Sequence, residues 1–382
     1  MRSLSDTISR LGRLRAMGSA AGRTEHATHL EPLAPPATNP GALDGFVHVP
    51  AGLTPGAALV VVLHGCTQTA AGYDEAAGWS QLADQHGFVV LFPQQTRSNN
   101  GNLCFNWFSP EDTRRDGGEA ASIHAMVRAV ATTHPIDPAR IFVTGLSAGG
   151  AMAAVMLATY PEVFAAGAVV AGLPFGSAAG VPEAFDRMRG HNVPSGDILA
   201  AAVRAASPHA GPWPRLQVWH GSTDNTVSPA NAAGLIEQWR GIHGLAHQPD
   251  RADRIDGYPR RTWLGADGAP VIEDYSITGM GHGTPLSPGD AEGIGASAPY
   301  MLDVGISSTH HIARFFGILD AVADRAAAPH NVPAIRPRPA AAPEPAPAAR
   351  PTSRPTSAPT SRPASGPGRV IEDALRAAGL MR

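Results

Sequence analysis

The sequence predicts an α/β fold with a mostly parallel, doubly wound sheet between two layers of helices. Residues 58–63 and 87–92 are apolar runs without the alternation of apolar and polar residues that marks a half-exposed strand. Such runs are typical of parallel strands that are buried on both faces. Helix-compatible stretches at 73–86 and 117–134 lie between and after these runs. Strands that alternate with helices in this way form parallel sheets.

The remaining elements continue the alternation along the chain. A first short strand is expected at 45–50, and a strand at 140–144 leads into a helix at 151–160. An insertion rich in Gly, Pro and Ala between 172 and 215 is either a small cap over a site or a plain surface excursion. The other expected elements are strands at 164–171, 215–220, 261–264 and 271–277, and helices at 229–243 and 307–325.

Composition and charge limit the classes of function. A chain of 382 residues with 43% hydrophobic residues can bury a sizeable core. Basic and acidic residues are near balance, 29 against 32, so nothing indicates a nucleic-acid partner. No apolar run approaches the ~18 residues that a membrane span needs. Arg10, Arg13 and Arg15 interrupt the segment that would be apolar in a signal peptide. We therefore expect no membrane span and no cleavable signal, which favours the cytoplasm.

Composition also predicts five parts in the chain. Residues 1–23 have the spacing of a short amphipathic helix, and the Pro-rich residues 24–43 are expected to form a connector. The folded domain is expected at 44–325. Residues 326–368 are rich in Pro, Ala, Ser and Thr and lack the apolar side chains that would offset the entropy of ordering, so a disordered linker is predicted there. Residues 369–382 can form one short helix.

Residues 145–149 read Gly-Leu-Ser-Ala-Gly and join a predicted strand to a predicted helix. This pattern in this context is typical of a nucleophile elbow, where the serine lies on a strained turn and flanking glycines let strand and helix pass closely. The chain has 42 glycines, so the pattern gains its weight from the strand before it and the helix after it. Ser147 is the predicted nucleophile.

A nucleophilic serine needs a histidine to take its proton and a carboxylate to orient that histidine. In α/β-hydrolases the acid and then the histidine follow the serine along the chain. Asp224 follows the predicted strand at 215–220, and His282 follows the one at 271–277. Active sites in open α/β sheets lie at such strand ends. We therefore predict Asp224 as the acid and His282 as the base.

Other residues of the same types compete for these roles. The competing aspartates lie in turn-rich or mid-strand positions and need no function there, and a given histidine among 16 is more often a bystander than a base. The Gly-rich segment around His282 favours that residue. The competitors are Asp253, Asp256, Asp267, Asp274, His220, His243, His247, His310 and His311.

Acyl transfer also needs N–H donors for the oxyanion. They are usually the amide after the nucleophile and an amide in the loop after an early strand. These positions are Ala148 and, in the His-Gly-Cys-Thr loop that starts at residue 64, Cys66. Side chains and backbone amides carry out this chemistry, so we expect no metal and no cofactor.

With these motifs the sequence resembles the poly(3-hydroxybutyrate) depolymerase family of α/β-hydrolase esterases, which is related to feruloyl and acetylxylan esterases. The resemblance covers roughly residues 44–320. Many family members have Ala-Trp-Ser after the histidine, where this chain has Gly-Thr-Pro at 283–285, so the substrate range stays open. The motifs that carry the resemblance lie at 63–68, 104–108, 145–150, 220–224 and 281–285.

The resemblance implies an α/β-hydrolase fold with a cap-like insertion and a groove that binds the substrate. By resemblance, Cys66 supplies an oxyanion amide and Trp107 lines the groove. His64, Asn106 and Phe108 lie in the same motifs and are the further substrate-binding candidates.

The implied activity is that of a serine esterase. It would cleave poly(3-hydroxybutyrate)-type polyesters or their oligomers through an acyl-enzyme, with feruloyl or acetylxylan esters as the alternative substrates. A binding protein of polymer granules or of the cell surface that keeps the fold is the alternative from another class. The basic linker and the apolar face of the last short helix suggest granule contact through the tail. Family members also make an extracellular location the alternative to the cytoplasm.

The two cysteines of the chain, Cys66 and Cys104, both lie in these motifs and near strand ends. We expect them to lie close together. A disulfide would tie the loop that carries Trp107 to the loop that carries Cys66, but it persists only in an oxidising compartment. Two free thiols fit the missing signal peptide, so both alternatives stay open.

Overall fold

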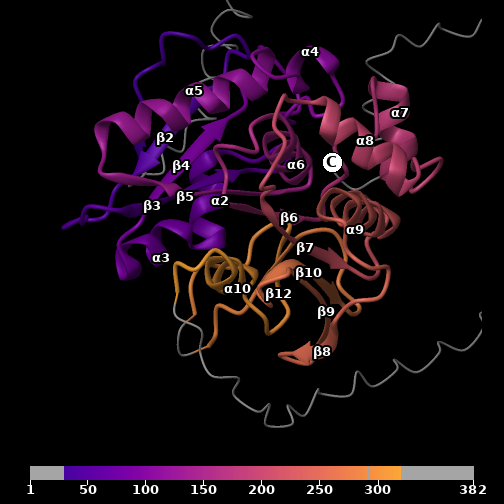
Figure 1. The fold of residues 1–382 in the computed structure, drawn as a ribbon. Coiled ribbons are helices and arrows are strands. Elements are labelled where there is room, and N and C mark those ends of the chain that lie inside the picture. The colour runs from indigo at the N-terminus through magenta and orange to yellow at the C-terminus, as the bar shows by residue number, and fades with distance from the viewer. Residues whose placement is uncertain (1–29, 291–292, 320–382) are drawn as a thin grey trace, which may run out of the picture. The chain divides into compact units, whose positions relative to one another are not determined.

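A computed structural model describes residues 30–290 and 293–319 of the chain. In this part the predicted α/β fold is confirmed, with helices on both faces of a largely parallel sheet (Figure 1). The predicted N-terminal helix at 1–23, the linker at 326–368 and the short helix at 369–382 lie outside the described residues.

The described strands of the central sheet are β1 Glu31–Pro32, β2 Asp44–His48, β3 Ala57–Leu63, β4 Val89–Gln94, β5 Ile136–Leu146, β6 Ala166–Val170, β7 Arg215–Gly221, β8 Arg251–Ile255, β9 Tyr258–Leu264 and β10 Pro270–Ile277. They follow the order β1-β2-β4-β3-β5-β6-β7-β10-β9-β8. The run from β4 to β10 in this order is parallel, and the pairs at both edges are antiparallel. A separate parallel pair joins β11 Thr284–Leu286 to β12 Met301–Asp303.

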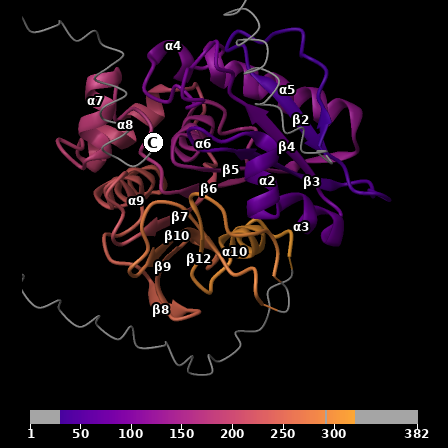
Figure 2. The same ribbon diagram turned by 180° about the vertical axis from the view of Figure 1, so that it is seen from behind.

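Helices cover both faces of the sheet (Figures 1 and 2). The described helices are α2 Ala70–Ala77, α3 Trp79–His86, α4 Pro110–Thr113, α5 Gly118–Thr133, α6 Ala148–Thr159, α7 Val181–Met188, α8 Gly196–Ala205, α9 Ala230–His243 and α10 Ser308–Phe315. Helices α5, α6 and α9 pack in the apolar core on one face, and α2, α3 and α10 pack in the core on the other. None of the described helices is long and apolar enough to cross a membrane.

Strand β3 shows why the apolar runs lack alternation. Leu59, Val61 and Leu63 pack in the core with α5 and α6, whereas Val60 and Val62 pack in the opposite core with α2 and α3. Every residue of β3 is buried. Because each fully buried Val or Leu contributes about 1.5–3 kcal/mol, a polar residue on either face of this strand would weaken the fold.

Two predicted helices differ from the observed ones. The stretch at 73–86 belongs to two helices, because Gly78 between α2 and α3 has a φ of 75° and its left-handed conformation ends α2. The helix predicted to run from 307 to 325 ends at Phe315, and the Ile318 N–H then donates to the Ala313 carbonyl. Residues beyond 319 lie outside the described part.

Residues 30–43, which the composition assigns to a connector, are attached to the domain. Leu30 and Leu43 are buried, and β1 pairs with β2. The Gly41 N–H also donates to Ser122 Oγ of α5 at 2.8 Å. The folded part of the chain therefore includes this segment.

The sequence did not indicate β8 or the helices of the insertion. Strand β8 is the exposed edge of the sheet, and its mixture of charged and apolar residues gives no signal of burial. Helices α7 and α8 form within the insertion at 172–215.

Candidate active site

Ser147 lies on the turn between β5 and α6. Its φ of 57° and ψ of −118° lie outside the regions that a residue with a side chain normally adopts. A Cβ atom on Gly145 would lie 2.5 Å from the carbonyl carbon of Gly149, and one on Gly149 would lie 2.3 Å from the carbonyl oxygen of Leu63. Both glycines are therefore required for this strained turn to close against the end of β3.

Asp224 and His282 meet where β7 and β10 end. His282 Nδ1 and Asp224 Oδ2 are 2.7 Å apart, and the two side chains are 7% and 0% exposed. Asp224 Oδ1 accepts from the N–H groups of Thr226 and Val227, both at 2.8 Å. Because an ionised carboxylate only accepts hydrogen bonds, His282 carries its proton on Nδ1 and presents Nε2 as the acceptor nitrogen.

The charge of Asp224 is set by opposing effects. Burial opposes its ionisation, but hydrogen bonds from His220, His282 and the Val227 amide hold the pKa of Asp224 well below its usual range. The carboxyl group is therefore ionised at neutral pH.

Two loops, residues 221–227 and 278–283, carry this pair and are here called the acid–base loops. The Ser222 N–H donates to the Ile277 carbonyl at 3.0 Å, and Thr223 Oγ1 donates to the Met280 carbonyl at 2.9 Å. The Gly279 N–H donates in return to Ser222 Oγ at 2.9 Å. Since β7 and β10 are neighbours, the two loops fix each other through short-range contacts.

Ser147 lies at the same end of the sheet, where the parallel strands have their carboxyl ends. Strand β6 separates β5 from β7, and the Ser147 N–H donates to the carbonyl of Val170 at the end of β6 at 2.9 Å. Among the described residues, no hydrogen bond joins the Ser147 hydroxyl to His282. The structure thus brings Asp224 and His282 into contact and places Ser147 on the turn after β5, at the same end of the parallel strands.

One competing residue, His220, lies against the acid, and three of the competing aspartates are held in ion pairs. His220 Nε2 is 2.8 Å from the Val227 carbonyl and 3.5 Å from Asp224 Oδ2, so this ring packs against the acid. Its position four residues before Asp224 is the one signal that the sequence offered for this contact. The competing aspartates Asp253, Asp256 and Asp274 form ion pairs with Arg260, His311 and Arg261, respectively.

The loop of residues 64–68 follows β3 beside the Ser147 turn. Cys66 and Cys104 form a disulfide, which decides between the two alternatives that the sequence left open. The Thr67 N–H donates to the Asn102 carbonyl at 2.7 Å. In the described part of the chain, the N–H groups of Cys66 and Ala148 have no hydrogen-bond acceptor. Two such donors near a serine can hold a negatively charged oxygen.

Trp107 and Phe108 pack in one apolar cluster with Ala148, the residue that follows Ser147, and their role in a groove stays a prediction. Their rings contact edge to face at 5.6 Å between centroids. Trp107 is buried with Ala148, and Ala184 and Met188 of α7 pack in the same apolar cluster. The insertion therefore contributes side chains to the apolar cluster next to the serine.

The prediction of His64 as a substrate-binding residue is wrong. Its side chain is 1% exposed, with Nδ1 at 2.8 Å from the Gly65 carbonyl and Nε2 accepting from the Gln95 N–H at 3.2 Å. Burial lowers the pKa of His64 to about 4, so the ring is neutral at pH 7. The sequence shows that His64 follows a strand, but not that its ring turns into the core.

Asn106, the last of the substrate-binding candidates, is engaged within its own loop. Its Oδ1 accepts from Asn100 Nδ2 at 2.8 Å. Its backbone N–H donates to Glu119 Oε2 at 2.8 Å. Glu119 is a buried carboxyl group on α5 that no sequence motif singles out, and its burial raises its pKa to about 8. No cluster of His, Cys, Asp and Glu that could hold a metal ion occurs within residues 30–290 and 293–319.

Comparison with known proteins gives a consistent result. The family described as Esterase PHB depolymerase matches residues 47–256. Poly(3-hydroxyalkanoate) depolymerase C of Paucimonas lemoignei is 49% identical over 288 residues, which cover 74% of this chain and 68% of that protein. Feruloyl esterase B of Talaromyces funiculosus is 33% identical over 256 residues, 65% of this chain and 71% of that protein. The solved structure of an acetyl xylan esterase from Aspergillus awamori matches with a TM-score of 0.65 and 26% identity, over 76% of this chain and 99% of that chain.

Proposed function

Because the chain belongs to the PHB depolymerase family of esterases, and is by that membership a carboxylic ester hydrolase, we propose that it cleaves the ester bonds of poly(3-hydroxyalkanoate) polymers or their oligomers. The observation that carries this choice of substrate is the 49% identity to a depolymerase over 74% of the chain. Identity to the feruloyl esterase is 33% over 65% of the chain. Membership of the family also confirms the resemblance that the motifs indicated.

The proposed reaction starts at Ser147. Its hydroxyl oxygen attacks the ester carbonyl carbon, and His282 Nε2 takes the hydroxyl proton. Asp224 holds the ring through Nδ1 and stabilises the imidazolium that forms, which the 2.7 Å contact supports. His282 then gives the proton to the departing alcohol, and an acyl-enzyme remains. Water repeats the sequence and releases the hydroxy acid.

In this mechanism the carbonyl oxygen becomes negatively charged, and the N–H groups of Cys66 and Ala148 stabilise it. Both amides lack an acceptor among the described residues, and Ala148 begins α6, where the helix dipole favours negative charge. Removing one such donor in a serine hydrolase costs about 10²–10³ in kcat.

The apolar cluster next to the serine favours an aliphatic ester. Side chains that pack around Ala148 are apolar, including Trp107, Leu173, Ala184 and Val227. Phe108 packs on this cluster and is only half-buried, so its ring offers apolar area to the methyl and methylene groups of a hydroxyalkanoate unit. Burial of each CH₂ contributes about 0.8 kcal/mol.

The tail at 326–382 supplies a second part of the proposal. Its Pro-rich composition and its arginines suit a tether that brings the enzyme to a polymer granule. Truncation after Arg325 should then leave turnover of a soluble ester unchanged and reduce adsorption to polymer particles. Equal adsorption of both forms would remove the tail from the proposal.

The experiment that tests the substrate is a comparison of turnover by the full chain and by Ser147→Ala. We expect the highest kcat/KM on hydroxybutyrate oligomers and measurable erosion of amorphous polymer, with neither activity in Ser147→Ala. Faster turnover of methyl ferulate or acetylated xylan would favour the carbohydrate esterases instead. Adsorption to polymer without hydrolysis would place the chain among the binding proteins.

A further inference from the structure

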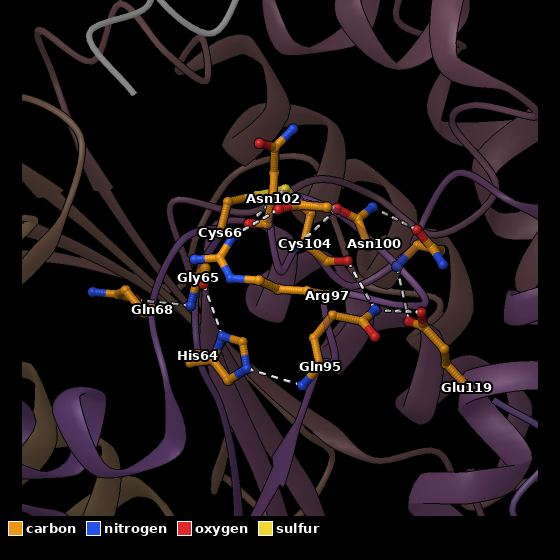
Figure 3. The surroundings of a disulfide bond; sticks show 12 residues. His64, Gly65, Cys66, Gln68, Gln95, Arg97, Asn100, Asn102, Cys104 and Glu119 are labelled. Carbon is orange, nitrogen blue, oxygen red and sulfur yellow. Dashed lines mark hydrogen bonds between the residues drawn. A yellow bond between two sulfur atoms is a disulfide. The ribbon is translucent and has the colours of Figure 1, made fainter. Parts of the chain in front are cut away.

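We propose that His64 is a positioning residue that aims the Cys66 N–H at the oxyanion. This inference rests on the proposed function, because it assigns a task to a donor of that mechanism. It starts from the contact between His64 Nδ1 and the Gly65 carbonyl oxygen, 2.8 Å apart (Figure 3). A buried imidazole between a strand end and a loop thereby binds the peptide unit that carries the donor.

Because the peptide group is planar, the contact of His64 with the Gly65 carbonyl also fixes the direction of the Cys66 N–H. The Gly65 carbonyl and the Cys66 N–H belong to one peptide unit, and in a trans peptide these two groups point in opposite directions. A hydrogen bond that holds the carbonyl toward the core therefore holds the N–H away from it. The Cys66 N–H has no acceptor in the described part of the chain, as a donor reserved for a substrate oxygen requires. A hydrogen bond to the carbonyl also polarises the peptide and strengthens its N–H as a donor.

The protonation of His64 is fixed by its surroundings. Because Nε2 accepts from the Gln95 N–H at 3.2 Å, it carries no proton, and Nδ1 must be the protonated nitrogen that donates to Gly65. The ring is 1% exposed and lies 5.0 Å from the Phe105 ring between centroids. This buried position keeps the imidazole neutral, so the donor to Gly65 is present throughout the neutral range.

Gln95, the residue after β4, is itself held by α5 and by the loop that contains Cys104. Its Nε2 lies 2.6 Å from Glu119 Oε1 and 2.9 Å from the Cys104 carbonyl oxygen. Figure 3 shows this chain of contacts running from Glu119 through Gln95 and His64 to Gly65. A residue of α5 thus supports the residue that aims the Cys66 amide.

Other restraints limit how far the amide would turn without His64. The Gln68 N–H also donates to the Gly65 carbonyl, at the longer distance of 3.3 Å. Gln68 Oε1 accepts from the Gly65 N–H at 2.8 Å, and the disulfide holds Cys66. We therefore expect loss of His64 to reduce the rate less than complete removal of an oxyanion donor would.

The test compares His64→Leu with His64→Asn. Leucine fills much of the space but has no donor, whereas the asparagine amide can place an N–H near the position of Nδ1. We expect His64→Leu to lower kcat by about 10- to 100-fold, less than the loss of a whole donor, with KM nearly unchanged. His64→Asn should recover most of this loss. Val127→Ala removes buried apolar atoms of α5 from the core between this helix and the sheet. This variant controls for a general loss of stability.

A second measurement follows the amide itself in the free protein. Cys66 is the cysteine that follows a glycine, so labelling with ¹³C-carbonyl glycine and ¹⁵N-cysteine isolates its backbone signal in an NMR spectrum. Loss of the hydrogen bond to Gly65 should shift the Cys66 ¹⁵N signal in His64→Leu and much less in His64→Asn. This readout needs no ester substrate. It therefore separates failure of the His64 proposal from failure of the esterase mechanism, which a fully active Ser147→Ala would reveal.

Two results would overturn the proposal. One is a kcat for His64→Leu within about twofold of the kcat of Val127→Ala. The other is a Cys66 signal that is the same in His64→Leu and in the wild type. Should His64→Leu not fold, the histidine ¹⁵N spectrum of the wild type decides. A neutral ring protonated on Nδ1 at about pH 5.5, whose signals disappear in His64→Asn, would support the proposal, and Nε2 protonation of every neutral histidine would contradict it.

Discussion

The acid–base loops and the 64–68 loop reach the same end of the sheet but are held there in different ways. The acid–base loops bind each other: Ser222 and Thr223 bond to residues that end β10 or follow it, and Asp224 accepts from amides within its own loop. The 64–68 loop depends on more distant segments. His64 bonds to Gln95 of the β4 end, Gln95 bonds to Glu119 of α5, and a disulfide ties Cys66 to Cys104.

This difference teaches which parts of such a site a local sequence can build. Neighbouring parallel strands bring their own loops together, so the acid and the base need only the right residue types at two strand ends. The direction of a backbone N–H is not encoded in its own side chain. Buried groups from several other segments must fix the direction of this N–H. Substitution of any one of these groups should therefore lower the rate only in part.

The largest expected effect breaks the acid–base loops alone. Asp224→Asn keeps an oxygen for the Thr226 and Val227 amides but no longer favours the Nδ1-protonated form of His282. We expect kcat to fall by about 10⁴ and the thermal unfolding temperature to change little. The matched control is Asp274→Asn on β10, a buried aspartate that is ion-paired with Arg261 and lies within the strand. Equal kcat values for the two variants would remove Asp224 from the mechanism.

A smaller effect is expected when the 64–68 loop loses its covalent restraint. Cys66 and Cys104 are 38 residues apart, so removal of their disulfide should cost about 4 kcal/mol of unfolding free energy by the loop-entropy relation. In Cys104→Ser we also expect kcat to fall by about tenfold, because the Cys66 amide is held less firmly. Dithiothreitol should reproduce both changes in the wild type and leave Cys104→Ser unaffected. A variant as stable and as active as the wild type would show that the bond does not hold the loop.

The smallest expected effect concerns Glu119 and pH. Burial raises the pKa of Glu119 to about 8 in the folded protein, above the ordinary value of 4.5 for this carboxyl group. The native state therefore binds more protons than the unfolded state between these values, and this group makes the protein less stable as pH rises toward 8. Burial lowers the pKa of His64 from 6.5 to about 4, which gives the opposite slope, but only below 6.5.

The measurement is the unfolding temperature of the wild type and of Glu119→Gln between pH 6.5 and 8.5, a range about the pKa of Glu119 in which His64 stays neutral. Glutamine does not titrate, so the fall of the unfolding temperature with pH should be smaller in the variant than in the wild type. A constant difference in unfolding temperature between the two proteins does not affect this comparison. Parallel curves would mean that Glu119 does not change its protonation in this range.

The sequence predicts one part of this site well because strand ends can be recognised from apolar runs. The runs before Ser147, Asp224 and His282 predict strands of one parallel sheet. The structure places all three residues after the carboxyl ends of β5, β7 and β10 in that sheet. Their catalytic roles stay predictions. The family membership of the chain could also be predicted from these motifs.

The rest could not be predicted, for physical reasons. Glu119 and Gln95 lie in a helix and at a strand end without any motif, and only the packing of α5 on the sheet brings them to His64. His64 was expected to face the substrate, since local sequence does not determine whether a side chain after a strand turns outward or inward. The break at Gly78 and the short edge strand β8 depend on tertiary contacts as well.

The most direct test of the central claim is covalent labelling of the serine. A p-nitrophenyl phosphonate reacts with a serine only when a base activates it and an oxyanion site accepts the new charge. Mass spectrometry of the labelled protein should find a single adduct, on the peptide that contains Ser147. The adduct should be absent in Ser147→Ala and form far more slowly in Asp224→Asn. An adduct on another residue, or full ester hydrolysis by Ser147→Ala, would contradict the assignment of Ser147, Asp224 and His282 as the catalytic residues.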